Sequence, residues 1–212
     1  MSTRRCTQLA RFRGKLIAIE GIDQAGKKTQ TRLLARGMRR RGWRVSVWEF
    51  PNYTTHLGRE LKAYLAGKSR LNLHAAHLLY AANRWEVAEE MEREIRGGVN
   101  AIVNRYWPSN LAYGISHGLP ADWLSCLDRG LPKLDMVIVL DISPRTSLKR
   151  KREGRDVHEV DLAYLKKVRN AYLRLARRYG WRVVDGEQDL KTLQSQLADL
   201  VIHSIRGTAA RR

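Results

Sequence analysis

The chain has 212 residues, of which 43% are hydrophobic and 29% are charged, a composition typical of a folded domain with a filled core. No stretch approaches the ~20 consecutive apolar residues of a membrane-spanning helix. The 40 Lys and Arg residues outnumber the 21 Asp and Glu residues, giving a net charge of +19. Such a charge fits a solvated basic surface, a nucleic-acid partner or a small polyanion drawn into a basic cleft, and composition alone does not separate these.

Hydrophobic patterning predicts strands that alternate with helices. The predicted strands are residues 15–20, 43–50, 99–104, 135–141 and 181–185. The predicted helices are residues 27–41, 57–66, 71–96, 108–116, 121–128, 158–178 and 189–205, and another opens at Pro144. This alternation indicates an α/β fold with a parallel sheet covered on both faces. Since no repeat or linker divides the chain, we expect one domain over residues 1–212, with a core of about 14–205 and basic tails at both ends.

The stretch "GIDQAGKKTQ", residues 21–30, nearly matches the phosphate-binding loop G-x-x-x-x-G-K-[S/T]. A glycine-rich turn between a strand and a helix points backbone N–H groups at one anion, and the helix N-terminus adds partial positive charge. We expect Lys27 to reach the β- and γ-phosphates of ATP. The alternative is a tight turn with chance glycines. The residues expected to bind ATP are Gly21, Ile22, Asp23, Gln24, Ala25, Gly26, Lys27, Lys28 and Thr29.

The two cysteines, Cys6 and Cys126, have neither metal-binding nor redox-motif spacing. They are therefore interpreted as free thiols in a reducing compartment, which predicts a cytoplasmic protein. The basic, acid-free segment before residue 16 weakly resembles a transit peptide, but a terminal tail is the preferred interpretation.

Segments along nearly the whole chain resemble, in the same order, the motifs of thymidylate kinases. The glycine loop, "IEGIDQAGKKTQ", is similar to the family pattern E-G-x-D-x-x-G-K-S-T-Q. The helix after the family lid resembles "DVHEVDLAYLKKVRNAYLRLA" (156–176). The other matching segments are "EFPNY" (49–53), "LLYAANRWE" (78–86), "NRYWPSNLAYG" (104–114) and "GLPKLDMVIVLDISP" (130–144).

The resemblance implies a three-layer P-loop kinase fold with a five-stranded parallel sheet and a short basic lid at about residues 149–157. It implies transfer of the γ-phosphoryl group of ATP to dTMP with Mg²⁺, giving dTDP and ADP, in a protein that forms homodimers. Small nucleotides are the expected partners, with neither a nucleic acid nor a membrane. Two alternatives stay open: a nucleotide kinase with another acceptor, and a weakly catalytic or non-catalytic nucleotide-binding paralogue.

The same resemblance assigns the acceptor site. Tyr80 and Arg84 are four residues apart on a predicted helix and so share a face; the family places an aromatic ring under thymine and an arginine on a base carbonyl at these positions. Arg105 directly follows a predicted strand, at the sheet edge where open α/β folds bind ligands, and is expected on the acceptor phosphate. Tyr113 is expected beside the sugar, favouring deoxyribose. The expected substrate-binding residues are Phe50, Tyr53, Tyr80, Arg84, Arg105, Ser109, Asn110 and Tyr113.

A run of basic residues, "KRKREGR" (149–155), is either a solvated face or the lid that the resemblance implies. Arginines on a lid would neutralise charge on the phosphoryl group during transfer. Gln24 stands where some family members have a loop arginine, so the lid is expected to supply it. The expected catalytic residues are Asp23, Lys27, Arg105, Arg150, Arg152 and Arg155.

Three residues depart from the family pattern. Lys28 replaces the hydroxyl that holds Mg²⁺, and Asn104 replaces the aspartate of the D-R-Y motif. Asp23 is then the expected protein ligand, with Mg²⁺ held mainly by the nucleotide phosphates. Asn52 stands in the "FPNY" loop where many relatives have an arginine, which removes one expected contact with the acceptor phosphate.

Overall fold

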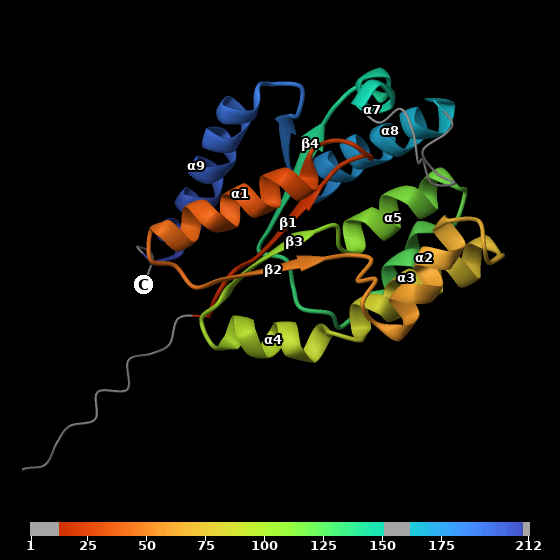
Figure 1. Ribbon diagram of the computed structural model, residues 1–212, viewed down its shortest axis with the longest axis horizontal. Coiled ribbons are helices and arrows are strands. Elements are labelled where there is room, and N and C mark those ends of the chain that lie inside the picture. The colour runs from red at the N-terminus through yellow and green to blue at the C-terminus, as the bar shows by residue number, and fades with distance from the viewer. Residues whose placement is uncertain (1–12, 151–161, 210–212) are drawn as a thin grey trace, which may run out of the picture.

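A sheet of five parallel strands forms the centre of the computed structural model, which describes residues 13–150 and 162–209 (Figure 1). The strands are β1 (Leu16–Glu20), β2 (Val45–Glu49), β3 (Asn100–Asn104), β4 (Met136–Asp141) and β5 (Arg182–Asp185). Their order across the sheet is β2-β3-β1-β4-β5. The predicted parallel α/β sheet is therefore confirmed, with each strand within two residues of its expected start.

Helices cover both faces of this sheet. On one face lie α1 (Lys27–Arg40) and α9 (Leu190–Ala209), which pack side by side (Figure 1). On the other lie α4 (Ala88–Arg96), α5 (Trp107–Ser116) and α8 (Leu162–Tyr179). Right-handed crossovers place α1 on the opposite face from α4, α5 and α8, because the connection from β1 to β2 crosses the sheet in the opposite direction to the later connections. No helix in the described part of the chain has the length and apolarity of a bilayer span.

The central strand β1 is buried along its whole length, which explains its unbroken apolar sequence. It pairs with β3 and β4, as in the alignment of Ile17 with both Ile102 and Met136. The carboxyl ends of the strands consequently meet at one edge, where Glu20 and Asn104 end neighbouring strands. Ligand sites of open parallel sheets lie at this edge.

The expected single helix over residues 71–96 is wrong, because the structure has two helices, α3 (Leu73–Trp85) and α4. Val87 leaves helical geometry with φ −121°, and the Glu86 carboxylate accepts hydrogen bonds from Asn83 Nδ2 and the Leu57 backbone N–H. The helices also pack against different elements. Whereas α4 packs on β3, α3 packs on α2 (His56–Leu65), α5 and α6 (Ala121–Leu127). Helical periodicity alone could not reveal this change of packing partner.

The predicted lid falls largely outside the described residues. Lys149 and Arg150 end helix α7 (Pro144–Arg150), whereas residues 151–157, which include Arg152 and Arg155, lie outside them. The first four residues of the predicted helix 158–178 and most of the two predicted basic tails also lie outside the described ranges.

Candidate active site

The glycine loop between β1 and α1 has the backbone geometry of a phosphate-binding turn. Gly21 has φ 135°, and a Cβ there would lie 2.5 Å from the Leu140 carbonyl oxygen. Gly26 caps α1 in the left-handed region with φ 87°. The Ser147 hydroxyl donates to the Asp23 carbonyl at 2.8 Å and so ties the loop to α7. Both glycines are thus required by the turn, which argues against chance glycines.

Lys27 lies buried within this loop. Its Nζ donates hydrogen bonds to the carbonyl oxygens of Gly21 at 3.0 Å and Ile22 at 2.7 Å. These acceptors are neutral, so a nucleotide phosphate would offer the ammonium group a stronger, charge-assisted bond. In the absence of a nucleotide, the loop carbonyls therefore hold the Lys27 ammonium group beside the place where a phosphate would bind.

A cavity of about 540 Å³ adjoins the loop and α1. Arg150, predicted on the lid, reaches its wall and donates to the carbonyl oxygens of Gln24 and Gly186, each at 3.1 Å. Residues 23–29 of the predicted ATP-binding set line this cavity, whereas Gly21 and Ile22 do not. It is called the donor cavity below, after the predicted phosphoryl donor, ATP. The remaining wall residues are Gln30, Asn104, Arg105, Arg150, Gly186, Gln188, Leu190 and Leu193. The wall between β5 and α9 was not predicted, because that loop has no motif that distinguishes it from an ordinary connection.

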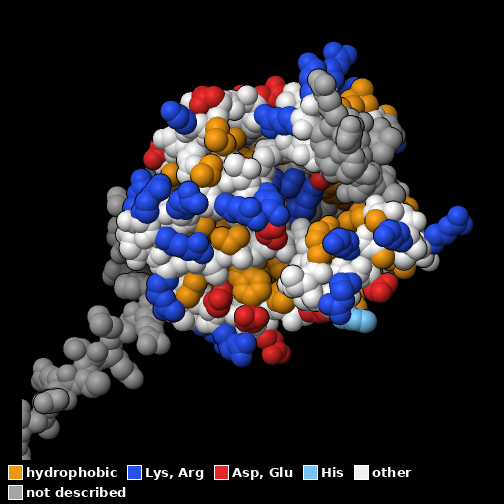
Figure 2. Space-filling model, viewed as in Figure 1, with side chains coloured by type: hydrophobic (Ala, Val, Ile, Leu, Met, Phe, Trp, Pro, Cys, Tyr) orange, Lys and Arg blue, Asp and Glu red, His pale blue; other side chains and the backbone are white. Residues whose placement is uncertain are grey.

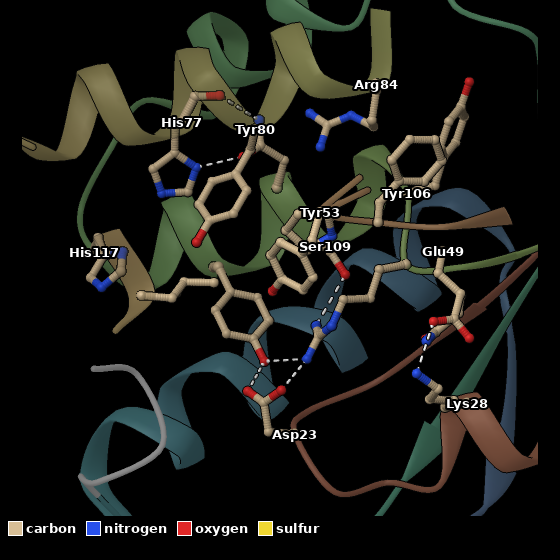
Figure 3. Close-up of a pocket in the computed structure, with 17 residues that line it drawn as sticks. Asp23, Lys28, Glu49, Tyr53, His77, Tyr80, Arg84, Tyr106, Ser109 and His117 are labelled. Atoms are coloured by element: carbon tan, nitrogen blue, oxygen red, sulfur yellow. Dashed lines mark hydrogen bonds and ion pairs between the residues drawn. The ribbon is translucent and has the colours of Figure 1, made fainter. Parts of the chain in front are cut away.

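A second cavity, of about 300 Å³, lies beyond the loop between the end of β2, α3 and α5 (Figure 3). This acceptor cavity brings together every predicted substrate-binding residue, from Phe50 to Tyr113. It also contains unpredicted residues: Glu49, Pro51, Leu65, His77, Tyr106 and His117. Asn52 does not line it; its side-chain oxygen accepts from the backbone N–H and hydroxyl of Thr54, which shapes the loop instead.

Arg84 enters the acceptor cavity as half of a buried ion pair. Its Nε and Nη2 donate to the two carboxylate oxygens of Asp128, at 2.7 and 2.8 Å. The side chains are only 4% and 6% exposed. This bidentate pair fixes the plane of the guanidinium group and leaves Nη1 for a ligand. Asp128 was not predicted, because a carboxylate in a loop 44 residues away has no sequence pattern that connects it with Arg84.

Asn110 is held in a similar way by His77. The Asn110 Oδ1 and His77 Nδ1 lie 2.7 Å apart, and Asn110 Nδ2 donates to the His77 carbonyl at 3.4 Å. Both side chains are buried. The ring of His77 also packs edge-on against Tyr80, with centroids 5.9 Å apart. The contacts orient the Asn110 amide, whose donors and acceptors suit the edge of a planar base.

Arg105 lies in the acceptor cavity beside Asp23 of the glycine loop and has φ 63°, an uncommon conformation for a side-chain-bearing residue. Its Nη2 pairs with the Asp23 carboxylate, and the Tyr113 hydroxyl donates to the same carboxylate at 2.6 Å. Burial would lower the pKa of Arg105, but the acidic groups around it, with Asp23 contributing most, together raise the pKa above its usual value. For the neutral hydroxyl of Tyr113, burial has the opposite effect and raises the pKa. Arg105 therefore stays positive and Tyr113 neutral near pH 7.

Glu20, fully buried at the end of β1, is linked to Arg105 through the hydroxyl of Ser109. Its carboxylate accepts from the Tyr106 backbone N–H at 2.7 Å, the Ser109 hydroxyl at 2.6 Å and the Tyr172 hydroxyl at 2.9 Å. Burial raises the pKa of Glu20 although these hydrogen bonds oppose it. Ser109 also accepts a bond from Arg105 at 3.3 Å, so the geometry favours a role in holding Arg105 over contact with a base.

Asn83, fully buried on α3, holds the loop that follows β2. Its Oδ1 accepts from the Asn52 backbone N–H at 2.7 Å, and its Nδ2 donates to the Asn52 carbonyl at 3.2 Å and the Thr55 hydroxyl at 2.9 Å. These bonds place Phe50 and Tyr53 against the cavity. This role was not predicted, because the burial of Asn83 cannot be seen in the sequence.

Comparison with known proteins decides the family. The model of the thymidylate kinase family matches residues 19–197. A thymidylate kinase of Schizosaccharomyces pombe is 34% identical and is aligned over 89% of this chain and 92% of its own length. The human thymidylate kinase is 32% identical, over 93% and 94% of the two chains. The chain belongs to the thymidylate kinase family.

A solved structure agrees with this assignment. The thymidylate kinase of Candida albicans superposes with a TM-score of 0.80 at 29% sequence identity, covering 89% of this chain and 91% of that one. The P-loop kinase fold is thereby confirmed. The resemblance to thymidylate kinases, predicted from the glycine loop and five later segments of the chain, is confirmed.

Around the glycine loop, the described residues offer few ligands for Mg²⁺. Lys28 pairs with Glu49 at 3.1 Å instead of offering a hydroxyl, and both oxygens of Asp23 already accept hydrogen bonds. Asn104 Oδ1 is buried without a hydrogen-bond partner, but it carries no charge. Nowhere in the described residues do three His, Cys, Asp or Glu side chains gather to hold a metal ion. The residues present therefore do not fit a metal site built by the protein alone.

Proposed function

We propose that the enzyme transfers the γ-phosphoryl group of ATP to dTMP. The bond between the γ-phosphorus and the β,γ-bridging oxygen breaks, which releases ADP. A bond forms between that phosphorus and a 5′-phosphate oxygen of dTMP, which gives dTDP. Because a phosphate monoester with a second pKa near ~6 is largely doubly ionised at pH 7, the acceptor needs no general base. Catalysis then depends on positioning and charge neutralisation.

The observation that supports this proposal best is the junction of the two cavities. The donor and acceptor cavities share Asp23, Lys28, Asn104 and Arg105 in their walls. A phosphate on each side of this junction would meet between charged side chains, as transfer between two phosphates requires. A nucleotide-binding protein that catalyses no transfer would have no need for two cavities that meet.

On the acceptor side, the aromatic ring of Tyr80 and the polar groups of Arg84 and Asn110 suit a flat pyrimidine with exocyclic oxygens. We assign Tyr113 to the sugar, where its ring would crowd a ribose 2′-hydroxyl. Arg105, held by Asp23, is assigned to the acceptor phosphate. Phe50 and Tyr53 close the cavity from the β2 side.

On the donor side, the glycine loop and Lys27 are assigned to the β- and γ-phosphates. Arg150 supplies a further cation from α7, and Arg152 and Arg155 complete the proposed lid. Mg²⁺ is proposed to arrive as its complex with ATP, held chiefly by the phosphates, with Asp23 as the candidate ligand from the protein.

A coupled assay of ADP release with dTMP, dUMP, dCMP and dGMP tests this function. We expect dTMP to give the highest kcat/KM, with dUMP weaker. A higher kcat/KM for another acceptor would replace the substrate assignment. ATP binding without ADP release on any acceptor would show a non-catalytic paralogue.

We also propose that the chain is a single domain that forms homodimers in the cytoplasm. Leu78 and Trp85, seven residues apart on α3, are 49% and 42% exposed, so one face of this helix presents apolar side chains to solvent. The exposed thiol of Cys126 suits a reducing compartment. Light scattering tests the dimer: Leu78→Glu should give monomers, whereas Val183→Glu, at an equally exposed residue of β5, should not.

A further inference from the structure

Lys28 lies in the first turn of α1 and contributes to the walls of both cavities. Its Nζ forms an ion pair with Glu49 Oε2 at 3.1 Å (Figure 3). Glu49 ends β2, beside the loop that closes the acceptor cavity. The ion pair therefore joins the phosphate loop to the acceptor side at the junction of the two cavities.

This ion pair is easily exchanged. The Lys28 side chain is 58% exposed and that of Glu49 33% exposed, and pairs between such side chains contribute little to stability. A phosphate carrying up to two negative charges attracts an ammonium group more strongly than one carboxylate at the same distance. Two phosphates brought to the junction would therefore compete with Glu49 for Lys28.

Arg32 allows Lys28 to leave Glu49 without leaving the carboxylate unpaired. It lies one turn further along α1, with Nη2 3.8 Å from Glu49 Oε1. Glu49 thus retains a cationic neighbour when Lys28 moves. Arg32 itself lines neither cavity. A band of Lys and Arg side chains crosses this face over α1, so the helix surface already attracts polyanions (Figure 2).

The other cations near the junction are less exposed than Lys28. Arg105 is paired with Asp23, so the two charges largely compensate each other. Lys27 is buried within the glycine loop. Lys28 is the exposed cation of the shared wall, and it stands where a hydroxyl would hold a metal in the loop motif.

We propose that Lys28 is an exchangeable catalytic cation. In the nucleotide-free enzyme it is bound to Glu49, and with both nucleotides present it turns to the phosphates at the junction. There it neutralises charge on the γ-phosphoryl group and the acceptor phosphate during transfer. The inference rests on the proposed function, whose bond changes it leaves unaltered.

Opposite effects of two substitutions test the exchange. We expect Lys28→Met to lower kcat by about tenfold and to weaken binding of dTMP and metal-free ATP in calorimetry. Glu49→Gln removes the competitor and should leave nucleotide binding equal or stronger. In a simple surface ion pair, both substitutions would remove the same contact and give the same small change. Identical behaviour of the two variants overturns the proposal.

A control and a double mutant exclude other causes. Arg32→Met removes a positive charge from the same helix and the same carboxylate but outside both cavities, so nucleotide affinity should change by less than about twofold. In the Lys28→Met background, Glu49→Gln should have no effect on affinity. If it strengthens binding there too, Glu49 acts by direct repulsion of phosphate and the exchange is refuted.

The two proposals fail in distinguishable ways. An unmodified enzyme that releases no ADP with any acceptor refutes the proposed kinase function, and calorimetry still decides whether Lys28 contacts phosphates. An active enzyme whose Lys28→Met variant keeps its kcat and both affinities refutes the role of Lys28 alone.

Discussion

In the acceptor cavity, polar side chains are held by buried side-chain partners, whereas in the donor cavity the cations contact backbone carbonyls and a partly exposed acid. Arg84 is paired with Asp128, and Asn110 with His77, and all four side chains are largely buried. On the donor side, Lys27 and Arg150 donate to carbonyl oxygens. The same chain therefore holds its ligand-binding groups in two different ways.

The difference corresponds to the task of each cavity. Recognition of a base requires donors and acceptors in fixed directions, which buried pairs supply before the ligand arrives. Neutralisation of a moving phosphoryl group requires cations that exchange one partner for another. Neutral carbonyls and an exposed carboxylate are weak enough partners to allow this exchange.

The largest expected effect comes from removing Lys27, the buried cation of the glycine loop. Lys27→Met should lower kcat by about 100-fold or more, since loss of one preorganised charge-stabilising group has this magnitude. Binding of dTMP should stay within about threefold of the parent, because the acceptor cavity is held independently. Steady-state kinetics and calorimetry measure the two quantities. Loss of dTMP binding would show that the cavities are not independent.

The next effect tests the fixed acceptor side. Asp128→Asn leaves the buried Arg84 without a carboxylate, and removing one partner of a buried pair destabilises a protein by about 3 kcal/mol. If Asp128 also orients Arg84 for the base, the preference for dTMP over dCMP in kcat/KM should fall by about tenfold. Urea unfolding and the acceptor assay measure these changes.

Asp128→Glu is the control, because it keeps the charge on a longer side chain. It should restore part of the preference for dTMP. Equal loss of activity with dTMP and dCMP in Asp128→Asn would mean that Asp128 contributes only to stability.

Local signals in the sequence were sufficient to predict the fold, and the resemblance to thymidylate kinases predicted eight residues of the acceptor cavity. The apolar run of β1 indicates a buried strand, and Gly21 and Gly26 indicate a tight turn. The helical spacing of Tyr80 and Arg84 places both side chains on one face of a helix. The split between α3 and α4 was missed, because it depends on packing against different elements rather than on periodicity.

The partners of the site residues could not be predicted either. Asp128 is 44 residues from Arg84 in sequence, and Glu49 lies on another element from Lys28. A single sequence shows which side chains can form an ion pair but not which ones meet in space. Most of the roles assigned to the lid stay predictions, because Arg152 and Arg155 lie outside the described residues.

A smaller effect is expected from restoring a metal-binding chemistry at the junction. Lys28→Ser together with Asn104→Asp would supply the hydroxyl and carboxylate of the loop and D-R-Y motifs. We expect half-maximal activity at several-fold lower Mg²⁺ than in the parent, without a higher kcat. Titration of Mg²⁺ at fixed ATP and dTMP measures the midpoint, and calorimetry with Mg²⁺ alone checks binding apart from activity. An unchanged midpoint would show that neither position governs the metal.

The smallest effect compares two carboxylates, one from each side of the site. Glu187, exposed beside the donor cavity, accepts from the Ser143 backbone N–H at 2.8 Å, and this bond and those of nearby hydroxyls lower the pKa of Glu187 to about 2. Between about pH 2 and 4.5 the folded state thus binds fewer protons than the unfolded state. The stabilisation by Glu187 is present above pH 4.5 and is lost as the pH falls towards 2.

Burial acts in the opposite direction on Glu20, whose pKa is raised above 4.5. The folded state then binds more protons, so this contribution is complete below pH 4.5 and is lost as the pH rises through the folded-state pKa. We therefore expect the free energy of unfolding of Glu187→Gln to approach that of the parent as the pH falls from 6 to 3. Relative to the parent, Glu20→Gln should become more stable as the pH rises. Urea unfolding across this range measures both slopes, and slopes of the same sign would contradict the contrast between a buried acceptor framework and an exposed donor side.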